Sequence, residues 1–174
     1  MKRLWMLIKE TVITLLVALA LSLVLRTYVV EARVVPTGSM LPTIQINDRL
    51  LVNKFIYDFT TPERGEIIVF APPEVLSSEN DYLKRVIGLP GEVVEVKSGE
   101  VFINGVALKE SYQHDRPDYN FGPVRVPDNA IFVLGDNRNE SYDSHAWGAW
   151  LTLDRIKGKA FLRYWPLKHF AMLH

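Results

Sequence analysis

The sequence predicts a mainly β domain preceded by one membrane-spanning helix. The helix is predicted from an apolar run within the first 30 residues, because a span needs about 20 apolar residues. Beyond residue 31, short apolar or alternating runs are separated by turn-forming residues, a pattern typical of β-strands. Residues 31–174 are numerous enough to form one domain with its own core.

The composition excludes several classes of partner and chemistry. The chain has 20 basic and 20 acidic residues and no basic stripe, so it predicts no nucleic-acid partner. Cysteine is absent, which rules out disulfides and thiol chemistry. The four histidines have no metal-binding spacing. The sequence therefore predicts neither a metal nor an organic cofactor.

The N-terminal segment reads as an uncleaved anchor. Residues 1–10 contain three basic side chains and are predicted to stay in the cytoplasm. Residues 11–30 form the predicted transmembrane anchor, with Trp5 and Tyr28 near the two interfaces and Arg26 reaching the far side. The domain that follows is then extracytoplasmic.

Two other interpretations of this segment stay open. A buried core helix would need a polar face, which is hard to find here. A cleaved signal peptide would use Val30-Glu31-Ala32 as its cleavage site.

The β domain is predicted to contain many short strands and only short helical pieces. Asn104-Gly105 is a strong signal for a type I′ hairpin. The runs 60–65 and 72–81 read as loops. The predicted strands cover residues 49–54, 66–70, 83–87, 92–97, 101–103, 106–108, 130–134 and 158–164.

One serine stands out after the anchor. Ser39 lies between Pro36 and Pro42, directly after Gly38. Proline fixes its own φ and extends the residue before it, while glycine lets another backbone come close. We expect a stiff, exposed turn that holds the Ser39 hydroxyl in place. Serine is a weak nucleophile without a neighbouring base, so the base must come from elsewhere in the chain.

The chain offers two sources for that base. Lys84 lies in a predicted strand and shares a face with Tyr82 and Val86. Burial there would lower the lysine pKa toward 7–8, at roughly 3–5 kcal/mol of differential solvation. The other source is His145 with Asp143 as its orienting partner, which would form a triad with the serine. This second pair belongs to a polar, turn-rich stretch, residues 135–148, of the kind that often contains functional sites.

These stretches, in this order behind an anchor, resemble the type I signal peptidase family. The matching blocks are residues 36–43, 48–54, 82–91 and 135–148. With the hairpin of residues 92–108 and the closing strand, the resemblance covers nearly the whole chain. It implies a mostly antiparallel β fold, docked on the outer membrane face, with a Ser–Lys dyad.

The resemblance also implies roles for single residues. Ser39 matches the nucleophile and Lys84 the general base. The Ser39 backbone N–H and the Thr37 hydroxyl match the two oxyanion donors, although many members have serine at position 37. Ser141 matches a hydroxyl that orients the base, and Asp143 a supporting carboxylate.

Position 145 departs from the family pattern. His145 stands where many members have an arginine that pairs with the carboxylate. A histidine is charged only at lower pH, so this pairing is uncertain near neutrality and a triad stays formally open. The resemblance also implies shallow apolar subsites for small substrate side chains. Their lining would come from Val35, Met40, Ile44, Tyr82 and Leu83.

The function implied is a membrane-bound serine endopeptidase. It would remove N-terminal signal peptides from exported preproteins, after small residues in an Ala-x-Ala pattern, through an acyl-enzyme. Its partners would be preproteins and the lipid bilayer of a bacterial inner (plasma) membrane, with a thylakoid membrane as the other location. Two alternatives stay open: an anchored β domain that binds peptides without cutting them, and a self-cleaving repressor, which would lack an anchor.

Overall fold

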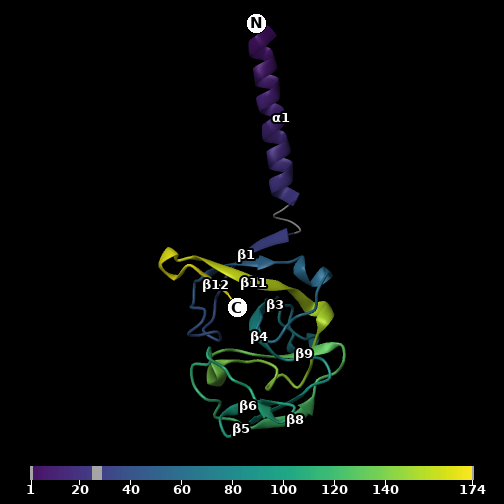
Figure 1. Ribbon diagram of the computed structural model, residues 1–174, viewed down its shortest axis with the longest axis vertical. Helices are drawn as coiled ribbons and strands as arrows, with labels where there is room; N and C mark the ends of the chain where they lie inside the picture. The colour runs from purple at the N-terminus through teal and green to yellow at the C-terminus, as the bar shows by residue number, and fades with distance from the viewer. Residues whose placement is uncertain (1, 25–28, 174) are drawn as a thin grey trace.

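The computed structural model describes residues 2–24 and 29–173. An N-terminal helix, α1 (Lys2–Val24), stands apart from a β domain (Figure 1). Within α1 the hydroxyls of Thr11 and Thr14 donate to backbone carbonyls four residues earlier, at 2.9 Å each. Both polar side chains are thereby satisfied inside an apolar helix, as a bilayer requires.

The stretch Trp5–Leu23 is long and apolar enough to cross a membrane, and none of it is buried against the domain. This exposure contradicts the core-helix interpretation. The helix differs from the predicted anchor at both ends, because it begins at Lys2 and because Val30 already belongs to a strand. The expected interface residues Arg26 and Tyr28 lie outside the described residues.

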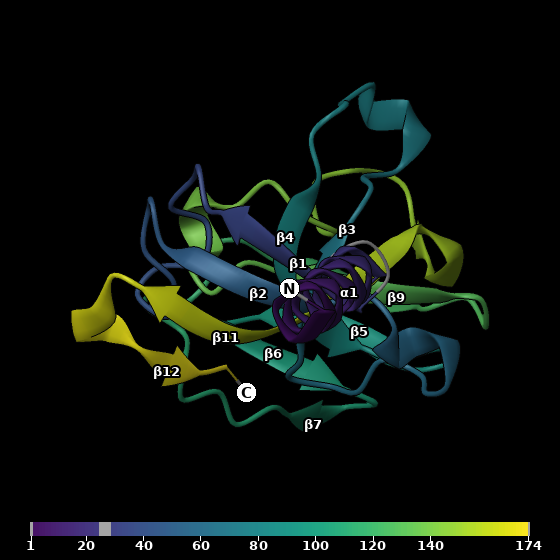
Figure 2. The same ribbon diagram turned by 90° about the horizontal axis from the view of Figure 1, so that it is seen from above.

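The larger sheet holds most of the strands, and all of its pairings are antiparallel. Its order is β1-β2-β11-β3-β4-β9-β10, with β12 paired to β11. Figure 2, viewed along α1, shows the hairpin of β11 and β12 projecting to one side. The strands are β1 (Val30–Val34), β2 (Arg49–Asn53), β3 (Ile67–Phe70), β4 (Tyr82–Gly88), β9 (Ala130–Leu134), β10 (Leu151–Thr152), β11 (Ile156–Trp165) and β12 (Ala171–Met172).

The smaller sheet lies at the end of the domain away from α1 (Figure 1). Its order is β7-β6-β5-β8, again antiparallel. Asn104 and Gly105 connect two of its strands with φ of 52° and 80°, and two positive φ values are those of a type I′ turn. The strands are β5 (Val93–Lys97), β6 (Glu100–Ile103), β7 (Val106–Ala107) and β8 (Phe121–Arg125).

The fold class is therefore the predicted one, and each predicted run contains a strand. Four strands were not predicted. The run of β1 merges with the apolar anchor, β8 contains Gly122-Pro123, and β10 and β12 have two residues each. A strand of two residues, such as β10 or β12, is too short to give a periodic signal in the sequence. Within residues 30–173, the helical pieces are short 3₁₀ turns at Ile56–Asp58, Glu74–Leu76, Arg138–Glu140, Leu153–Arg155 and Leu167–His169.

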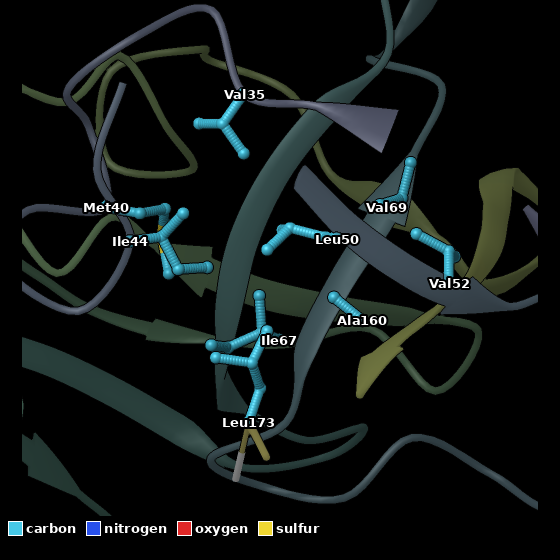
Figure 3. Close-up of a cluster of buried hydrophobic side chains, with 9 residues drawn as sticks. All are labelled: Val35, Met40, Ile44, Leu50, Val52, Ile67, Val69, Ala160 and Leu173. Carbon is cyan, nitrogen blue, oxygen red and sulfur yellow. The ribbon is translucent and has the colours of Figure 1, made fainter. Parts of the chain in front are cut away.

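One core cluster connects the serine turn to the larger sheet (Figure 3). Met40 and Ile44, from the turn itself, are at most 1% exposed and pack with Leu50 of β2 and Ile67 of β3. Fully burying one such side chain contributes about 1.5–3 kcal/mol. The position of the turn is thus fixed by the same contacts that stabilise the sheet.

Candidate active site

The turn that contains Ser39 is the connection between β1 and β2. Hydrogen bonds from Val35 N to Asp48 O and from Asn47 N to Val35 O, of 3.0 and 2.8 Å, close its base. Asn137 then contacts it from the stretch of residues 135–148. The Asn137 backbone N–H donates to Ser39 O at 3.1 Å, and its side-chain amide donates to Gly38 O at 3.2 Å.

The expectation of an exposed serine was wrong. Ser39 is 8% exposed, because Asn137 covers its backbone and Met40 enters the core beside it. The exposed residues nearest to it in this turn are Pro36, Thr37 and Pro42. A hydroxyl with little contact to water is held in a fixed place and surrounded by protein rather than solvent.

Lys84 lies beside that hydroxyl. It belongs to β4 and is 5% exposed, and its Nζ donates to Ser39 Oγ at 2.6 Å. Burial lowers the pKa of Lys84 to about 8, although the charges of Asp143 and Asp136 act to raise it. An amine with such a pKa is substantially neutral near pH 8, and in that form it can accept a proton.

Gly135 allows the 135–148 stretch to lie directly against the turn that contains Ser39. It follows β9, and a side chain there would overlap both the carbonyl oxygen of Ser39 and the hydroxyl of Ser141. No residue with a Cβ fits at this position without moving one of them. The glycine therefore lets the 135–148 stretch pack directly on the serine turn.

Asp143 and His145 pair with each other. The Asp143 side chain is fully buried, and its Oδ2 accepts a hydrogen bond from Gly135 N at 2.9 Å. Its Oδ1 lies 2.7 Å from His145 Nδ1. A neutral imidazole with its proton on Nδ1 can donate this bond, so the pairing does not require a charged histidine.

Among the described residues, the serine contacts the lysine and not the histidine. Ser39 Oγ is bonded to Lys84, whereas the His145 ring is stacked on Tyr119 with 3.9 Å between centroids. The geometry of a Ser–His–Asp triad needs a histidine nitrogen on the serine hydroxyl. The structure provides an amine there instead.

The other predicted site residues lie around this pair. Ser141 Oγ is buried and has no hydrogen-bond partner among the described residues, so its base-orienting role stays a prediction. Thr37 is exposed. Of the predicted subsite residues, Val35, Met40 and Ile44 are core side chains, while Tyr82 and Leu83 keep some exposed surface.

Several buried charges near the site were missed. Arg85 binds Asp136 through two hydrogen bonds of 2.8 and 2.7 Å. Arg138 likewise binds Glu110, at 2.7 and 2.5 Å. Two of the four residues lie in the 135–148 stretch and one is adjacent to Lys84. The position of these residues next to predicted site residues could have marked them as candidates, but nothing in the sequence identified which charges pair with each other.

A serine hydroxyl bonded to the amine of a buried lysine is the arrangement that a serine hydrolase with an amine base requires. Residues 8–165 match the family described as signal peptidase, peptidase S26. The chain belongs to this family, which confirms the resemblance seen in its motifs.

Similar proteins are named signal peptidases or processing peptidases. The chain is 46% identical to a probable signal peptidase I-2 of Synechocystis, over 97% of this chain and 77% of that protein. It is 48% identical to a signal peptidase I of Leptolyngbya laminosa, over 94% and 83%. A thylakoidal processing peptidase of Arabidopsis thaliana is 36% identical over 86% of this chain and 46% of its own length. The crystal structure of a signal peptidase I from Enterococcus faecalis is 32% identical, with a TM-score of 0.46, over 57% of this chain and 97% of that one.

Proposed function

We propose that this chain is a serine endopeptidase that removes signal peptides from preproteins, with Ser39 as nucleophile and Lys84 as general base. The family and the identity to named signal peptidases support the activity. The contact of 2.6 Å between Lys84 Nζ and Ser39 Oγ supports the residue roles. A peptide-binding domain without activity is not favoured, because the similar proteins are peptidases.

The proposed reaction begins with a neutral Lys84 amine. It takes the Ser39 proton as Oγ attacks the carbonyl carbon of the scissile bond. The Ser39 backbone N–H and the Thr37 hydroxyl would donate to the oxyanion that forms. The ammonium then protonates the leaving amine, which leaves an acyl-enzyme. Water, deprotonated by the same amine, hydrolyses this ester and restores Ser39.

The larger sheet offers a substrate peptide an open strand edge beside Lys84. β4 pairs with β3 through Tyr82–Arg85, but it pairs with β9 only from Arg85 onward. In the described sheet, no strand is paired with Tyr82–Lys84 on the β9 side. An extended signal peptide could add there as a strand. Met40 and Ile44 are buried in the core cluster against which Leu83 of this edge packs, and we propose that they form the floor of shallow subsites, which would favour small substrate side chains such as alanine.

The pH dependence of cleavage tests the assigned base. With a Lys84 pKa of about 8, the neutral fraction rises with pH, so kcat/KM should increase about tenfold per unit below pH 8 and level off above it. Preprotein cleavage is measured from pH 6 to 10 in the parent and in Lys84→Ala. A parent profile that is flat between pH 6 and 8 contradicts a lysine base with this pKa.

The apolar helix supports membrane anchoring. We propose a single-pass protein with its N-terminus in the cytoplasm and its β domain outside, at a plasma membrane. The thylakoidal relative keeps an internal membrane as the alternative. Shared attachment to the bilayer would raise the effective concentration of a membrane-bound preprotein at the enzyme.

The absence of cysteine allows a direct test of this topology. Leu16→Cys lies in α1 at a side chain that is 60% exposed, and Val106→Cys lies in the smaller sheet at one that is 72% exposed. A membrane-impermeant maleimide added to intact spheroplasts should label position 106 and leave position 16 unlabelled. Labelling of both contradicts the span. Labelling of position 106 only after lysis contradicts the orientation.

A further inference from the structure

The segment 109–120, between β7 and β8, packs against the 135–148 stretch of the site. His114 N donates to Asp136 O at 3.2 Å. Asp118 N donates to Asn139 Oδ1 at 2.9 Å, and the Asn139 amide donates to Arg116 O at 3.1 Å. Glu110 adds the buried ion pair with Arg138. The segment is thus fixed to this stretch at Asp136, Arg138 and Asn139.

Two tyrosines of this segment repeat one arrangement. The Tyr112 ring lies 3.9 Å from the Arg85 guanidinium, and Arg85 binds Asp136. The Tyr119 ring lies 3.9 Å from the His145 ring and is within 8° of parallel to it, and His145 binds Asp143. In each case an aromatic face covers the group that pairs with an aspartate.

These two aspartates are the charges that act on Lys84. Burial has the largest effect and lowers the pKa of Lys84, while Asp143 and Asp136 both act to raise it. A hydrogen-bond donor held on a carboxylate draws negative charge toward itself and weakens the field at the amine. The partners of the aspartates therefore favour the neutral, basic form of Lys84.

We propose that Tyr112 and Tyr119 are positioning residues that hold Arg85 on Asp136 and His145 on Asp143, and so keep Lys84 in its basic form. This inference depends on the proposed function, since it assigns a task relative to the catalytic lysine. Neither tyrosine touches the Ser39–Lys84 pair in the described contacts. Each acts through another side chain.

Tyr119 allows the sharper test, because its ring and its hydroxyl can be separated. The hydroxyl is buried and has no hydrogen-bond partner among the described residues. Burial, with the nearby Asp143, raises the pKa of Tyr119, and Glu110 and Asp118 act in the same direction while Arg138 opposes them. The hydroxyl therefore stays neutral, and the stack on His145 belongs to the ring alone. Tyr112 is less suitable, because its hydroxyl also donates to Glu110 at 2.9 Å.

The experiment compares pH profiles of preprotein cleavage in the full chain. In Tyr119→Leu we expect the acidic limb of kcat/KM to move upward by about half to one pH unit. The rate should recover toward that of the parent near pH 10, where Lys84 is neutral in both. Tyr119→Phe keeps the ring and should keep the acidic limb of the parent.

Phe121→Leu is the matched control. Phe121 packs in the same core cluster as Tyr119, with its ring 5.2 Å from that of Phe132, and it does not contact Arg85 or His145 in the described structure. Its acidic limb should stay in place. An equal shift in Phe121→Leu, or a Tyr119→Leu rate that falls by one factor at every pH, overturns the proposal.

Repeating the test in the His145→Ala variant shows whether Tyr119 acts through His145. If Tyr119 acts through His145, adding Tyr119→Leu to His145→Ala should produce no further shift of the limb. An additive shift overturns the proposed route. Should Tyr119→Leu fold poorly, Tyr119→Met fills more of the same space and is scored by the same criteria. Failure of the proposed function would look different, because Lys84→Ala would then cleave as the parent does.

Discussion

Replacing either Lys84 or Ser39 with alanine is expected to abolish cleavage of an Ala-x-Ala preprotein. The two side chains form one hydrogen-bonded unit of 2.6 Å, and each is buried away from water that could substitute for it. Loss of a general base alone lowers the rate roughly 10²–10⁴-fold. Loss of the nucleophile prevents formation of the acyl-enzyme. Because the pair acts as a unit, the double variant should be no worse than either single one.

His145→Ala is the control that distinguishes a lysine base from a histidine base. Asp143 would keep its hydrogen bond from Gly135 N, so we expect substantial activity to remain. A His145→Ala protein as inactive as Ser39→Ala would contradict the lysine assignment and favour a triad.

Loss of folding must be separated from loss of chemistry in these variants. Burial lowers the pKa of Lys84, which means that the charged amine is less favourable in the folded chain than in the unfolded one. Below pH 8 this cost is present in full, and it fades as pH rises toward the unfolded value. Lys84→Met should therefore have a Tm no lower than that of the parent at pH 7, while it lacks activity.

The sequence was sufficient for eight of the twelve described strands, and its local patterns singled out Ser39 and Lys84, whose side chains the structure brings into contact. Period-2 alternation fixes which side chains share a face, so the pattern around Lys84 was enough to place it among apolar neighbours. Two prolines and a glycine around Ser39 marked a special turn. These are local signals, and each depends on residues only a few positions apart.

Burial and pairing depended on contacts between distant positions. Ser39 is covered by Asn137, and Arg85 pairs with one aspartate among the 20 acidic residues of the chain. Local conformation does not identify such partners, because the pairing depends on how the strands are ordered in the sheet. The stack of Tyr119 on His145 joins two irregular loops, which have no periodic pattern at all.

Thr37→Val is expected to lower kcat by about 10²–10³-fold, as for loss of one oxyanion-hole donor. Valine has nearly the shape of threonine, so the change removes a hydroxyl and little else. Thr37 is exposed two residues before Ser39, where its hydroxyl would have to meet the substrate carbonyl, and no hydrogen bond within the described chain occupies it. The threonine side chain is restricted at χ1, which limits the hydroxyl to few directions.

The measurement is kcat at saturating preprotein for the parent, Thr37→Val and Thr37→Ser. Serine restores the hydroxyl without the methyl group, so its rate should match or exceed that of the parent, and the difference from valine then belongs to the donor. A donor that acts only on the developing negative charge changes kcat more than KM, because the ground-state carbonyl binds it weakly. If Thr37→Val stays within a few-fold of the parent in kcat, the second oxyanion donor must be another group, and Thr37 then only shapes the turn.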